Sequence, residues 1–301
     1  MNSSLPAGRN RGDLGASREA IESHYDLGND FYKLWLDQGM TYSSALWRGA
    51  DSLEEAQQQK LDFHVAQACA ARRERVLDVG CGWGSLLNRL VGQHGVTSAI
   101  GLTLSESQVR WIEETGLPGA YAVVENWLDH KPQLPYDAII SIGALEHFVR
   151  PELSSSERIH AYRTFFQSCH GWLKPDCWLS LQTIAYGNGT FSRGAISSIF
   201  PESDLPRTEE LVAASDGLFE VASLENDPAS YARTCREWLM RLRRNITAAR
   251  ALVGDEKARH FEAFLGAAAR GFDARVFFLL RIRLRRLNRL KQSIVYDDGG
   301  T

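Results

Sequence analysis

One turn constrains the fold of this chain more than any other feature. An apolar run, Arg75–Val79, leads directly into the glycine-rich turn Gly80–Gly84 (GCGWG), and leucines recur at helical spacing just after it. The sequence therefore predicts a strand, a tight turn and a helix whose first backbone N–H groups face a bound ligand. The alternative interpretation is that the glycines serve only to let the strand and the helix pack closely.

Strands alternate with helices beyond this turn. Further apolar runs predict four more strands, at Ser98–Leu102, Tyr121–Val124, Tyr136–Ile142 and Trp178–Ile184. Between them, helical patterns cover Glu106–Glu114 and Leu153–Leu173. This alternation predicts parallel pairing and an α/β fold with a doubly wound sheet. A further helix, a strand and a long helical region are then predicted at Arg207–Ser215, Phe219–Leu224 and Tyr231–Arg270.

The N-terminal part has a different pattern. Residues 1–17 are rich in Ser, Gly and Arg without apolar periodicity, which predicts a mobile tail. Helices are predicted over Asp30–Asp37 and from Ser52 to about Ala70, where Ser52 and Glu55 have the spacing of a capping box. We therefore expect a tail at 1–17, a helical cap at 18–70, and one Rossmann-like domain at 71–301 with a Gly- and Ser-rich lid at 185–207.

Composition narrows the class of protein. The 301 residues carry 34 basic and 37 acidic side chains, and this balance argues against a general nucleic-acid binder. No apolar run reaches the length of a membrane span. The five cysteines are scattered and odd in number, so we expect no disulfide framework, no structural zinc site and a reducing cytoplasm. The sequence permits an oligomer.

The segment Arg281–Lys291 holds six basic residues and no acidic one. One interpretation is a peripheral docking surface for anionic lipid headgroups or for an acyl-carrier partner. The favoured interpretation is a strand in which Arg281, Arg283 and Arg285 face water while the aliphatic side chains between them pack inward.

Three details around the glycine turn limit the kinds of ligand that it can bind. Asp78 precedes the glycines and no Gly-Lys-Ser/Thr follows them, which excludes a phosphate-cradling P-loop. The second predicted strand ends in Gly101–Ser105 (GLTLS), without the acid that would bind the ribose of NAD. Polar and aromatic groups at Glu125–Trp127 (ENW) follow the third strand and suit a purine. Together these features favour S-adenosylmethionine as the cofactor.

Several longer blocks then occur in a characteristic order: His24–Tyr32 (HYDLGNDFY), Thr41–Ala45 (TYSSA), Val76–Gly84 (VLDVGCGWG), Gly101–Gln108 (GLTLSESQ), Ser141–Phe148 (SIGALEHF) and Tyr231–Thr234 (YART). With these blocks the chain resembles the cyclopropane-fatty-acid synthases and mycolic acid cyclopropane synthases. Plant alkaloid N-methyltransferases share several of the blocks. The resemblance implies a class I methyltransferase fold, in which N-terminal helices and a lid after the fifth strand close over the cofactor.

The resemblance also implies contacts to S-adenosylmethionine, position by position. They come from the N-terminal cap and from the ends of the first three strands. The residues are Tyr42 and Ser43 from the cap, Gly80 and Gly82 beside the methionine moiety, Thr103 and Gln108 near the ribose, and Asn126 with Trp127 at the adenine.

In the family that the chain resembles, a bicarbonate ion held by five residues serves as a base. Three of those positions match here, Ile142, Glu146 and Tyr231, whereas Ser44 replaces a Cys and Gln182 replaces a His. An amide carries no proton that titrates near neutral pH. The sequence therefore leaves open whether bicarbonate binds, whether Glu146 or a water is the base, or whether no base is needed.

The reaction that the resemblance implies is transfer of a methyl or methylene group to an alkene carbon of a lipid or lipid-like acceptor. The predicted lid is shorter than in the family and consists mostly of small and polar residues, and Gln182 departs from the family pattern. These features support an alternative, a small-molecule C-, N- or O-methyltransferase of secondary metabolism. A third hypothesis, a cofactor-binding protein without catalysis, is disfavoured because Glu146 and Tyr231 are present.

Four other side chains admit two interpretations each. Trp35, Trp47 and Trp238 fit either an apolar acceptor pocket or ordinary core packing. His147 fits either a role beside Glu146 or simple capping and packing.

Overall fold

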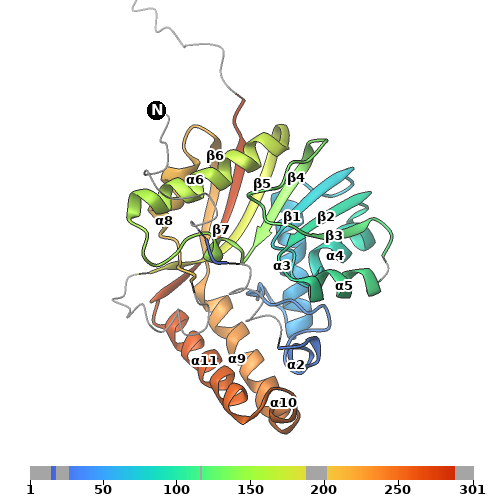
Figure 1. Cartoon of the computed structure of the whole chain (residues 1–301), viewed down its shortest axis with the longest axis vertical. Helices are drawn as coiled ribbons and strands as arrows, with labels where there is room; N and C mark the ends of the chain where they lie inside the picture. The colour runs from blue at the N-terminus through green and yellow to red at the C-terminus, as the bar shows by residue number, and fades with distance from the viewer. Residues whose placement is uncertain (1–14, 18–26, 116, 188–201, 289–301) are drawn as a thin grey trace, which may run out of the picture.

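A seven-stranded sheet forms the centre of the molecule. The computed structural model describes residues 15–17, 27–115, 117–187 and 202–288, so most of the predicted tail and lid lie outside the described residues. The strand order is β3-β2-β1-β4-β5-β7-β6 (Figure 1). The strands are β1 (Arg75–Val79), β2 (Ser98–Thr103), β3 (Ala120–Val124), β4 (Tyr136–Ile142), β5 (Leu173–Tyr186), β6 (Phe219–Asn226) and β7 (Phe277–Arg286). The predicted α/β class is confirmed.

The first five strands run parallel, and β7 is antiparallel to both β5 and β6. Because β1 lies between β2 and β4, the winding direction of the chain reverses at β1, and ligands of such sheets bind at the carboxyl ends beside this reversal. The predicted bounds of β1 and β4 agree with the structure. Strand β5 begins earlier than predicted. It includes Pro175 and Asp176, two residues of types that rarely continue a strand.

Helices cover both faces of the sheet. On one face, α6 (Ser155–Trp172) and α8 (Thr208–Ser215) pack against alternate strand residues such as Leu77 and Ile139. On the other face, α3 (Leu53–Gln67) and α4 (Ser85–His94) pack against their neighbours Val76, Ala138 and Ile140. Helix α5 (Glu106–Thr115) follows β2. This alternation is the pattern that a doubly wound sheet requires.

A third group of helices lies beyond one end of the sheet (Figure 1). It comprises α2 (Asn29–Lys33), α9 (Pro228–Arg244), α10 (Ile246–Val253) and α11 (Asp255–Asp273), which share one apolar cluster. The long helical region predicted from Tyr231 is therefore three helices. The chain breaks at Asn245 and at Gly254, whose φ of 84° lies outside the helical region.

The N-terminal helices follow the prediction in part. The Ser52 hydroxyl caps α3 by accepting from the Glu55 N–H at 3.2 Å, while the Glu55 carboxylate reaches the Asp51 N–H at 3.0 Å. Helix α2 ends at Lys33 and not at Asp37. The backbone tightens there, because the Leu34 and Trp35 N–H groups donate to carbonyls three residues earlier, and the Asp37 carboxylate then accepts from the N–H groups two and four residues later and forms a turn.

The basic strand requires one correction. Arg285 is exposed and Arg283 is half-buried, but Arg281 is only 2% exposed, so the prediction that Arg281 faces water is wrong. Its guanidinium donates to the Asp227 carboxylate at 2.8 Å, and this ion pair makes the burial tolerable. The end of the basic segment, 289–291, lies outside the described residues.

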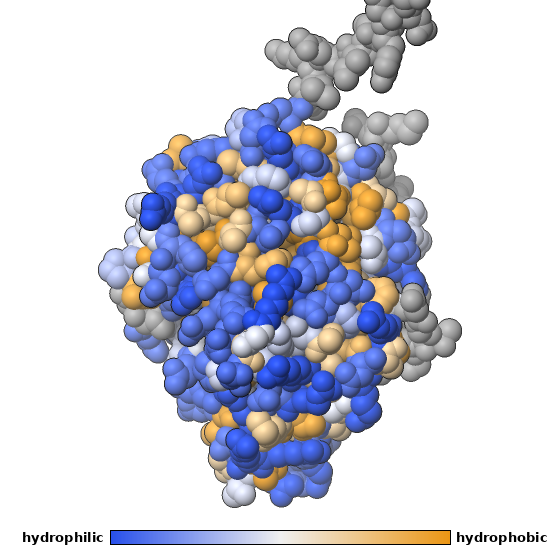
Figure 2. Space-filling model, turned by 180° about the vertical axis from the view of Figure 1, so that it is seen from behind, coloured by the Kyte–Doolittle hydropathy of each residue, from blue (hydrophilic) through white to orange (hydrophobic). Residues whose placement is uncertain are grey.

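The surface is mixed in character. Seen from behind, hydrophilic side chains cover most of it, and apolar residues gather in the upper part of that face (Figure 2). Among the helices that the structure describes, none has both the length and the apolar character needed to cross a bilayer.

Candidate active site

A cavity of about 160 Å³ opens over the carboxyl ends of β1, β2 and β4. All eight residues that the resemblance assigns to the cofactor line it: Tyr42, Ser43, Gly80, Gly82, Thr103, Gln108, Asn126 and Trp127. They come from the N-terminal segment and from the loops after three neighbouring strands. We call this space the cofactor cavity.

The glycine turn leaves room for a ligand against its backbone. Gly80 and Gly82 have φ values of 82° and 53°, which favour glycine. A Cβ atom on Gly80 would lie 2.6 Å from the Ala144 Cβ, whereas a Cβ on Gly82 would meet no atom within 4 Å and would project into free space. A cradle of this kind, which a side chain would fill, fits the methionine end of S-adenosylmethionine.

The far end of the cofactor cavity is polar and aromatic. The Thr103 hydroxyl donates to the Gln108 side chain at 2.5 Å, so the two predicted ribose contacts lie together. The Asn126 side chain accepts from the Leu128 N–H at 3.0 Å, which orders the loop after β3. The Trp127 ring packs on Phe148 with centroids 4.9 Å apart. These contacts form an aromatic surface of a kind that suits a purine.

Sequence reasoning missed a buried charged group beneath this cavity. Lys60, on α3, is 1% exposed and donates to the Ser43 hydroxyl at 3.0 Å. Burial lowers the pKa of Lys60 to about 7, although the nearby carboxylates of Asp37 and Asp78 oppose the shift. Burial likewise raises the pKa of Asp78 to about 7, against the attraction of Lys60. Lys60 occupies a position in the buried stripe of α3, at helical spacing from Ala56, Gln57 and His64, and a charged residue in such a stripe was the signal that could have found it.

The N-terminal segment also contributes to the cofactor cavity. Gly15 and Ala16, which lie in the predicted mobile tail, line it. The Ala16 N–H donates to the His147 carbonyl at 2.9 Å, and the Ser17 N–H donates to the Glu202 carboxylate at 2.8 Å. These three residues therefore pack against the site, while residues 1–14 lie outside the described part of the chain.

A second cavity, of about 170 Å³, adjoins the first. Four of the five residues predicted for the reaction centre line it, namely Ser44, Glu146, Gln182 and Tyr231, whereas Ile142 lines the cofactor cavity. The two cavities share four lining residues: Tyr42, Ser43, Gly143 and His147. We call the second space the acceptor chamber, because a molecule there lies next to the cofactor cavity.

Glu146 is a buried carboxylic acid that lines the acceptor chamber. It lies in a 3-10 turn, Leu145–His147, just after β4. Its Oε1 atom accepts from the Ile184 N–H at 2.6 Å, while its buried Oε2 atom has no hydrogen-bond partner among the described residues. Burial raises the pKa of Glu146 to about 7, and the bond from the Ile184 N–H opposes the shift. A carboxyl poised near neutral pH suits proton transfer.

Gln182 is held by its neighbours on both sides. It is 1% exposed, its Nε2 donates to the Ser44 carbonyl at 3.2 Å, and its Oε1 accepts from Arg281 Nε at 2.9 Å. The Ser44 hydroxyl turns back to the Ala45 carbonyl. Ser44 therefore faces Gln182 through its backbone, so the loss of a Cys side chain there changes this contact little.

Aromatic rings in mutual contact line one wall of the acceptor chamber. Tyr231 stacks on Phe272 with centroids 4.4 Å apart and also contacts Trp238, which in turn contacts Tyr42. Phe277 extends the wall beyond Phe272. Such faces stabilise a nearby positive charge and exclude water.

The three tryptophans divide between the two interpretations. Trp238 lines the acceptor chamber, and Trp35 lies fully buried in the core. The Trp47 indole N–H donates to the Thr234 hydroxyl at 3.0 Å and so holds the N-terminal segment to α9. His147 lies at the boundary of the two cavities with its Nδ1 2.8 Å from the Ser203 hydroxyl, and burial lowers its pKa to about 4.

The sheet order and the two adjoining cavities define a class I S-adenosylmethionine-dependent methyltransferase. The crystal structure of mycolic acid cyclopropane synthase CmaA1 complexed with SAH and CTAB superposes with a TM-score of 0.82. It is 29% identical, and the match covers 91% of this chain and 100% of that one. The described part of this chain therefore has the fold of a methyltransferase that binds the demethylated cofactor.

The family follows from the sequence match. Residues 13–282 match the mycolic acid cyclopropane synthetase family, and the chain belongs to it. Cyclopropane mycolic acid synthase 2 of Mycobacterium tuberculosis is 32% identical over 260 residues, or 79% of this chain and 84% of that protein. The cyclopropane-fatty-acyl-phospholipid synthase of Escherichia coli K12 is 32% identical over 262 residues, or 84% of this chain and 64% of that protein. This protein is an S-adenosylmethionine-dependent methyltransferase of that family.

Proposed function

We propose that this enzyme transfers a methyl or methylene group to an alkene carbon of a lipid-like acceptor. The observation that carries the proposal is the unpartnered, buried Oε2 atom of Glu146 in a chamber walled by aromatic rings and joined to the cofactor cavity. An apolar chamber with a buried carboxyl suits a reaction that passes through a carbocation and ends with proton loss. The names of the relatives, cyclopropane mycolic acid synthase and cyclopropane-fatty-acyl-phospholipid synthase, support the same acceptor class.

S-adenosylmethionine, when bound, supplies an electrophilic methyl group on a sulfonium. We assign its methionine end to Gly80 and Gly82, its ribose to Thr103 and Gln108, and its adenine to Asn126 and Trp127. Tyr42 and Ser43 lie at the boundary of both cavities and would align the methyl group with the acceptor while excluding water.

In the acceptor chamber, the alkene carbon would take the methyl group, so that one C–C bond forms as the S–CH3 bond breaks, S-adenosylhomocysteine leaves with the electron pair of that bond, and a carbocation remains at the neighbouring carbon. Loss of a proton from the new methyl group supplies the electron pair that closes a cyclopropane ring. We assign the proton to Glu146, whose raised pKa makes the carboxyl a workable acceptor near pH 7. Tyr231, on α9, borders the same space, whereas Ile142, at the end of β4, lines the adjoining cofactor cavity.

Bicarbonate is the second candidate for the base. It would contact Glu146, Tyr231 and the Ser44 and Gln182 positions that depart from the family pattern. Gln182 offers an N–H donor to an anion but cannot exchange a proton with it at neutral pH. The dependence of the rate on added bicarbonate, measured in carbonate-depleted buffer, distinguishes the two bases.

The deciding experiment supplies the enzyme with S-adenosylmethionine and vesicles of monounsaturated phosphatidylethanolamine. We expect a lipid product heavier by one CH2 that has lost its double bond, detected by mass spectrometry. A methyl-branched alkene would restrict the function to simple C-methylation. An unchanged lipid, with turnover on an amine or phenol instead, would reject the lipid proposal.

That last outcome corresponds to the alternative, a small-molecule C-, N- or O-methyltransferase. The observation that favours it is the wall at Gln182, where a neutral amide backed by a buried arginine replaces the family His. A wall of this kind can orient an oxygen of a polar acceptor.

Two further proposals concern surroundings rather than chemistry. All five cysteines are free, which supports our assignment of a reducing, cytoplasmic environment. The exposed end of β7 at Arg285 supports a peripheral contact with anionic lipid, testable by flotation of the protein with vesicles of anionic and neutral composition.

A further inference from the structure

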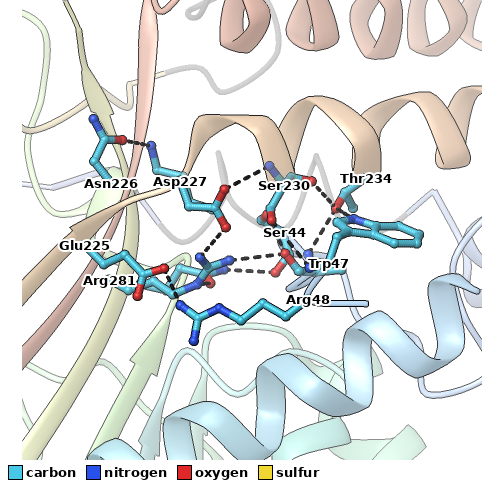
Figure 3. A network of polar contacts seen from close by, with 12 residues as sticks. Ser44, Trp47, Arg48, Glu225, Asn226, Asp227, Ser230, Thr234 and Arg281 are labelled. Carbon is cyan, nitrogen blue, oxygen red and sulfur yellow. Dashed lines mark hydrogen bonds and ion pairs between the residues drawn. The ribbon is translucent and has the colours of Figure 1, made fainter. Parts of the chain in front are cut away.

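A single buried arginine joins β5, the start of α9 and the N-terminal segment, three elements that contribute residues to the acceptor chamber. Arg281, on β7, donates from Nε to Gln182 of β5 at 2.9 Å, from Nη1 to Asp227 at 2.8 Å, and from Nη2 to the Ala45 carbonyl at 3.2 Å. Figure 3 shows its guanidinium between Asp227 and the segment that begins at Ser44. The protein thus buries a cation that the cofactor cavity does not need.

The contact with Arg281 decides which way the Gln182 amide points. If its oxygen and nitrogen were exchanged, the Arg281 Nε–H would face an NH2 group, and the amide oxygen would face the Ser44 carbonyl. Both contacts would then be repulsive. The nitrogen therefore lies on the side of Ser44 and the chamber, and the oxygen on the side of Arg281.

His64 supports the same orientation from α3. It is fully buried, and burial lowers its pKa well below 6.5, with the charges of Lys60 and Arg281 adding to the shift. Its Nδ1 lies 2.8 Å from the Ser180 hydroxyl, and its Nε2 lies 3.5 Å from Gln182 Oε1. When the hydroxyl donates to Nδ1, the neutral ring carries its proton on Nε2 and presents it to the amide oxygen.

The same arginine is tied to the helix that carries Tyr231. Asp227 caps α9 by accepting from the Ser230 N–H at 3.2 Å while its other oxygen accepts from Arg281. One turn further, the Thr234 hydroxyl accepts from the Ala45 N–H at 3.1 Å. The backbone of Ala45, next to Ser44, is therefore held on both sides, by Arg281 and by α9.

We infer that Arg281 is a positioning residue of the acceptor chamber, which locks the Gln182 amide with its nitrogen toward Ser44 and the reacting molecule. Gln182 Nε2 carries two hydrogens, of which Ser44 takes one, so the wall offers the other to an oxygen of the acceptor or of an anion. Because the amide oxygen bonds to a cation, the N–H is polarised and becomes a stronger donor. Unlike a histidine, this donor keeps its protons at every physiological pH.

The direct test follows the Gln182 side chain by NMR in protein labelled with ¹⁵N at glutamine and saturated with S-adenosylhomocysteine. Its two amide hydrogens, identified by their loss in Gln182→Ala, should give separate signals that exchange slowly with water. In Arg281→Met these signals should broaden or exchange at least tenfold faster. Fast exchange in the unmodified enzyme, or unchanged signals in Arg281→Met, would overturn the inference. This arm needs no acceptor, so it stands apart from the proposed function.

The kinetic arm rests on the proposed function and uses monounsaturated phospholipid vesicles. We expect Arg281→Met to lower kcat by about tenfold or more, because the donor is no longer aimed, with affinity for S-adenosylhomocysteine within twofold. The change should have no further effect in a Gln182→Ala background, since both act through one contact. Losses that multiply, or a loss of cofactor affinity equal to the loss of kcat, would instead indicate a merely structural role.

Two variants serve as controls. Arg48→Met removes a neighbouring, exposed arginine that pairs with Glu225 outside the chamber, and it should leave kcat and the Gln182 signals unchanged (Figure 3). Arg281→Met alone leaves Asp227 without its cation and can fail to fold. In that event Arg281→Met combined with Asp227→Asn, which removes both charges and keeps a capping side chain, decides the question by the same two measurements.

Discussion

The cofactor cavity and the acceptor chamber share a boundary but are built in different ways. Six of the eight residues that we assign to the cofactor lie at the ends of β1, β2 and β3 or in the short segments that follow them, although the N-terminal segment and the turn after β4 also line the cofactor cavity. The acceptor chamber takes its walls from the N-terminal segment, the turn after β4, β5, α9, α11 and β7. Local motifs therefore determine the first, whereas long-range packing determines the second.

The largest expected effect breaks the cofactor cavity alone. Gly82→Asp places a charged side chain in the free space of the glycine turn, so we expect binding of S-adenosylhomocysteine to fall below detection in calorimetry. The matched control is Gly217→Asp, which has a similar φ of 69° and open space but lies in the turn between α8 and β6. Retained affinity in Gly82→Asp would remove the cofactor assignment.

The next effect should be confined to the acceptor chamber. Glu146→Gln keeps the hydrogen bond from the Ile184 N–H but cannot accept a proton, so we expect kcat to fall by about 100-fold with cofactor affinity within twofold. Glu152→Gln, an exposed change six residues away, is the control for protein handling and for the loss of one negative charge. A normal rate in Glu146→Gln would show that this carboxyl is not the base.

The pH dependence sharpens the same assignment. Because the pKa of Glu146 is raised to about 7 in the folded protein, kcat should rise with pH through about 7, as the carboxyl becomes ionised. This rise of kcat with pH should disappear in Glu146→Gln. If the rise persists in the variant, another ionisable group controls the pH dependence of kcat.

Stability should show the opposite sign. A carboxyl whose pKa is raised on folding favours the folded state fully below its unfolded pKa of 4.5, and this contribution is lost as pH rises through about 7. Removing the charge by Glu146→Gln should therefore raise the free energy of unfolding by a few kcal/mol at most, more at pH 8 than at pH 5, in urea titrations. An equal effect at both pH values would contradict the burial of an ionising carboxyl.

The smallest expected effect concerns Lys60, which lies beneath the cofactor cavity and donates to Ser43 at the boundary of the two cavities. Lys60→Met removes the donor to the Ser43 hydroxyl and the positive charge that attracts Asp78, so affinity for S-adenosylhomocysteine should fall by about tenfold. Lys131→Met, an exposed change, should leave the affinity unaltered. If both variants bind equally well, Lys60 supports only the fold.

Prediction from sequence succeeded where structure is local. The strand bounds of β1 and β4 and the Ser52 cap depend on neighbours a few residues away, and the sequence carries those signals. It failed for Arg281, because alternation along a strand assumes one wet face, whereas both faces of β7 at this position are covered. The break at Gly254 was likewise hidden within a continuous helical pattern.

The sequence by itself determined the class of fold, the family and the glycine turn that we assign to the cofactor, because the spacing of apolar residues and of glycines acts through the backbone over a few residues. Only the tertiary structure decided that Glu146 keeps an unpaired oxygen, that Lys60 and Arg281 are buried cations, and that Gln182 turns its nitrogen toward Ser44. Burial and hydrogen-bond direction arise between residues as far apart as 45 and 281, and no local pattern encodes them.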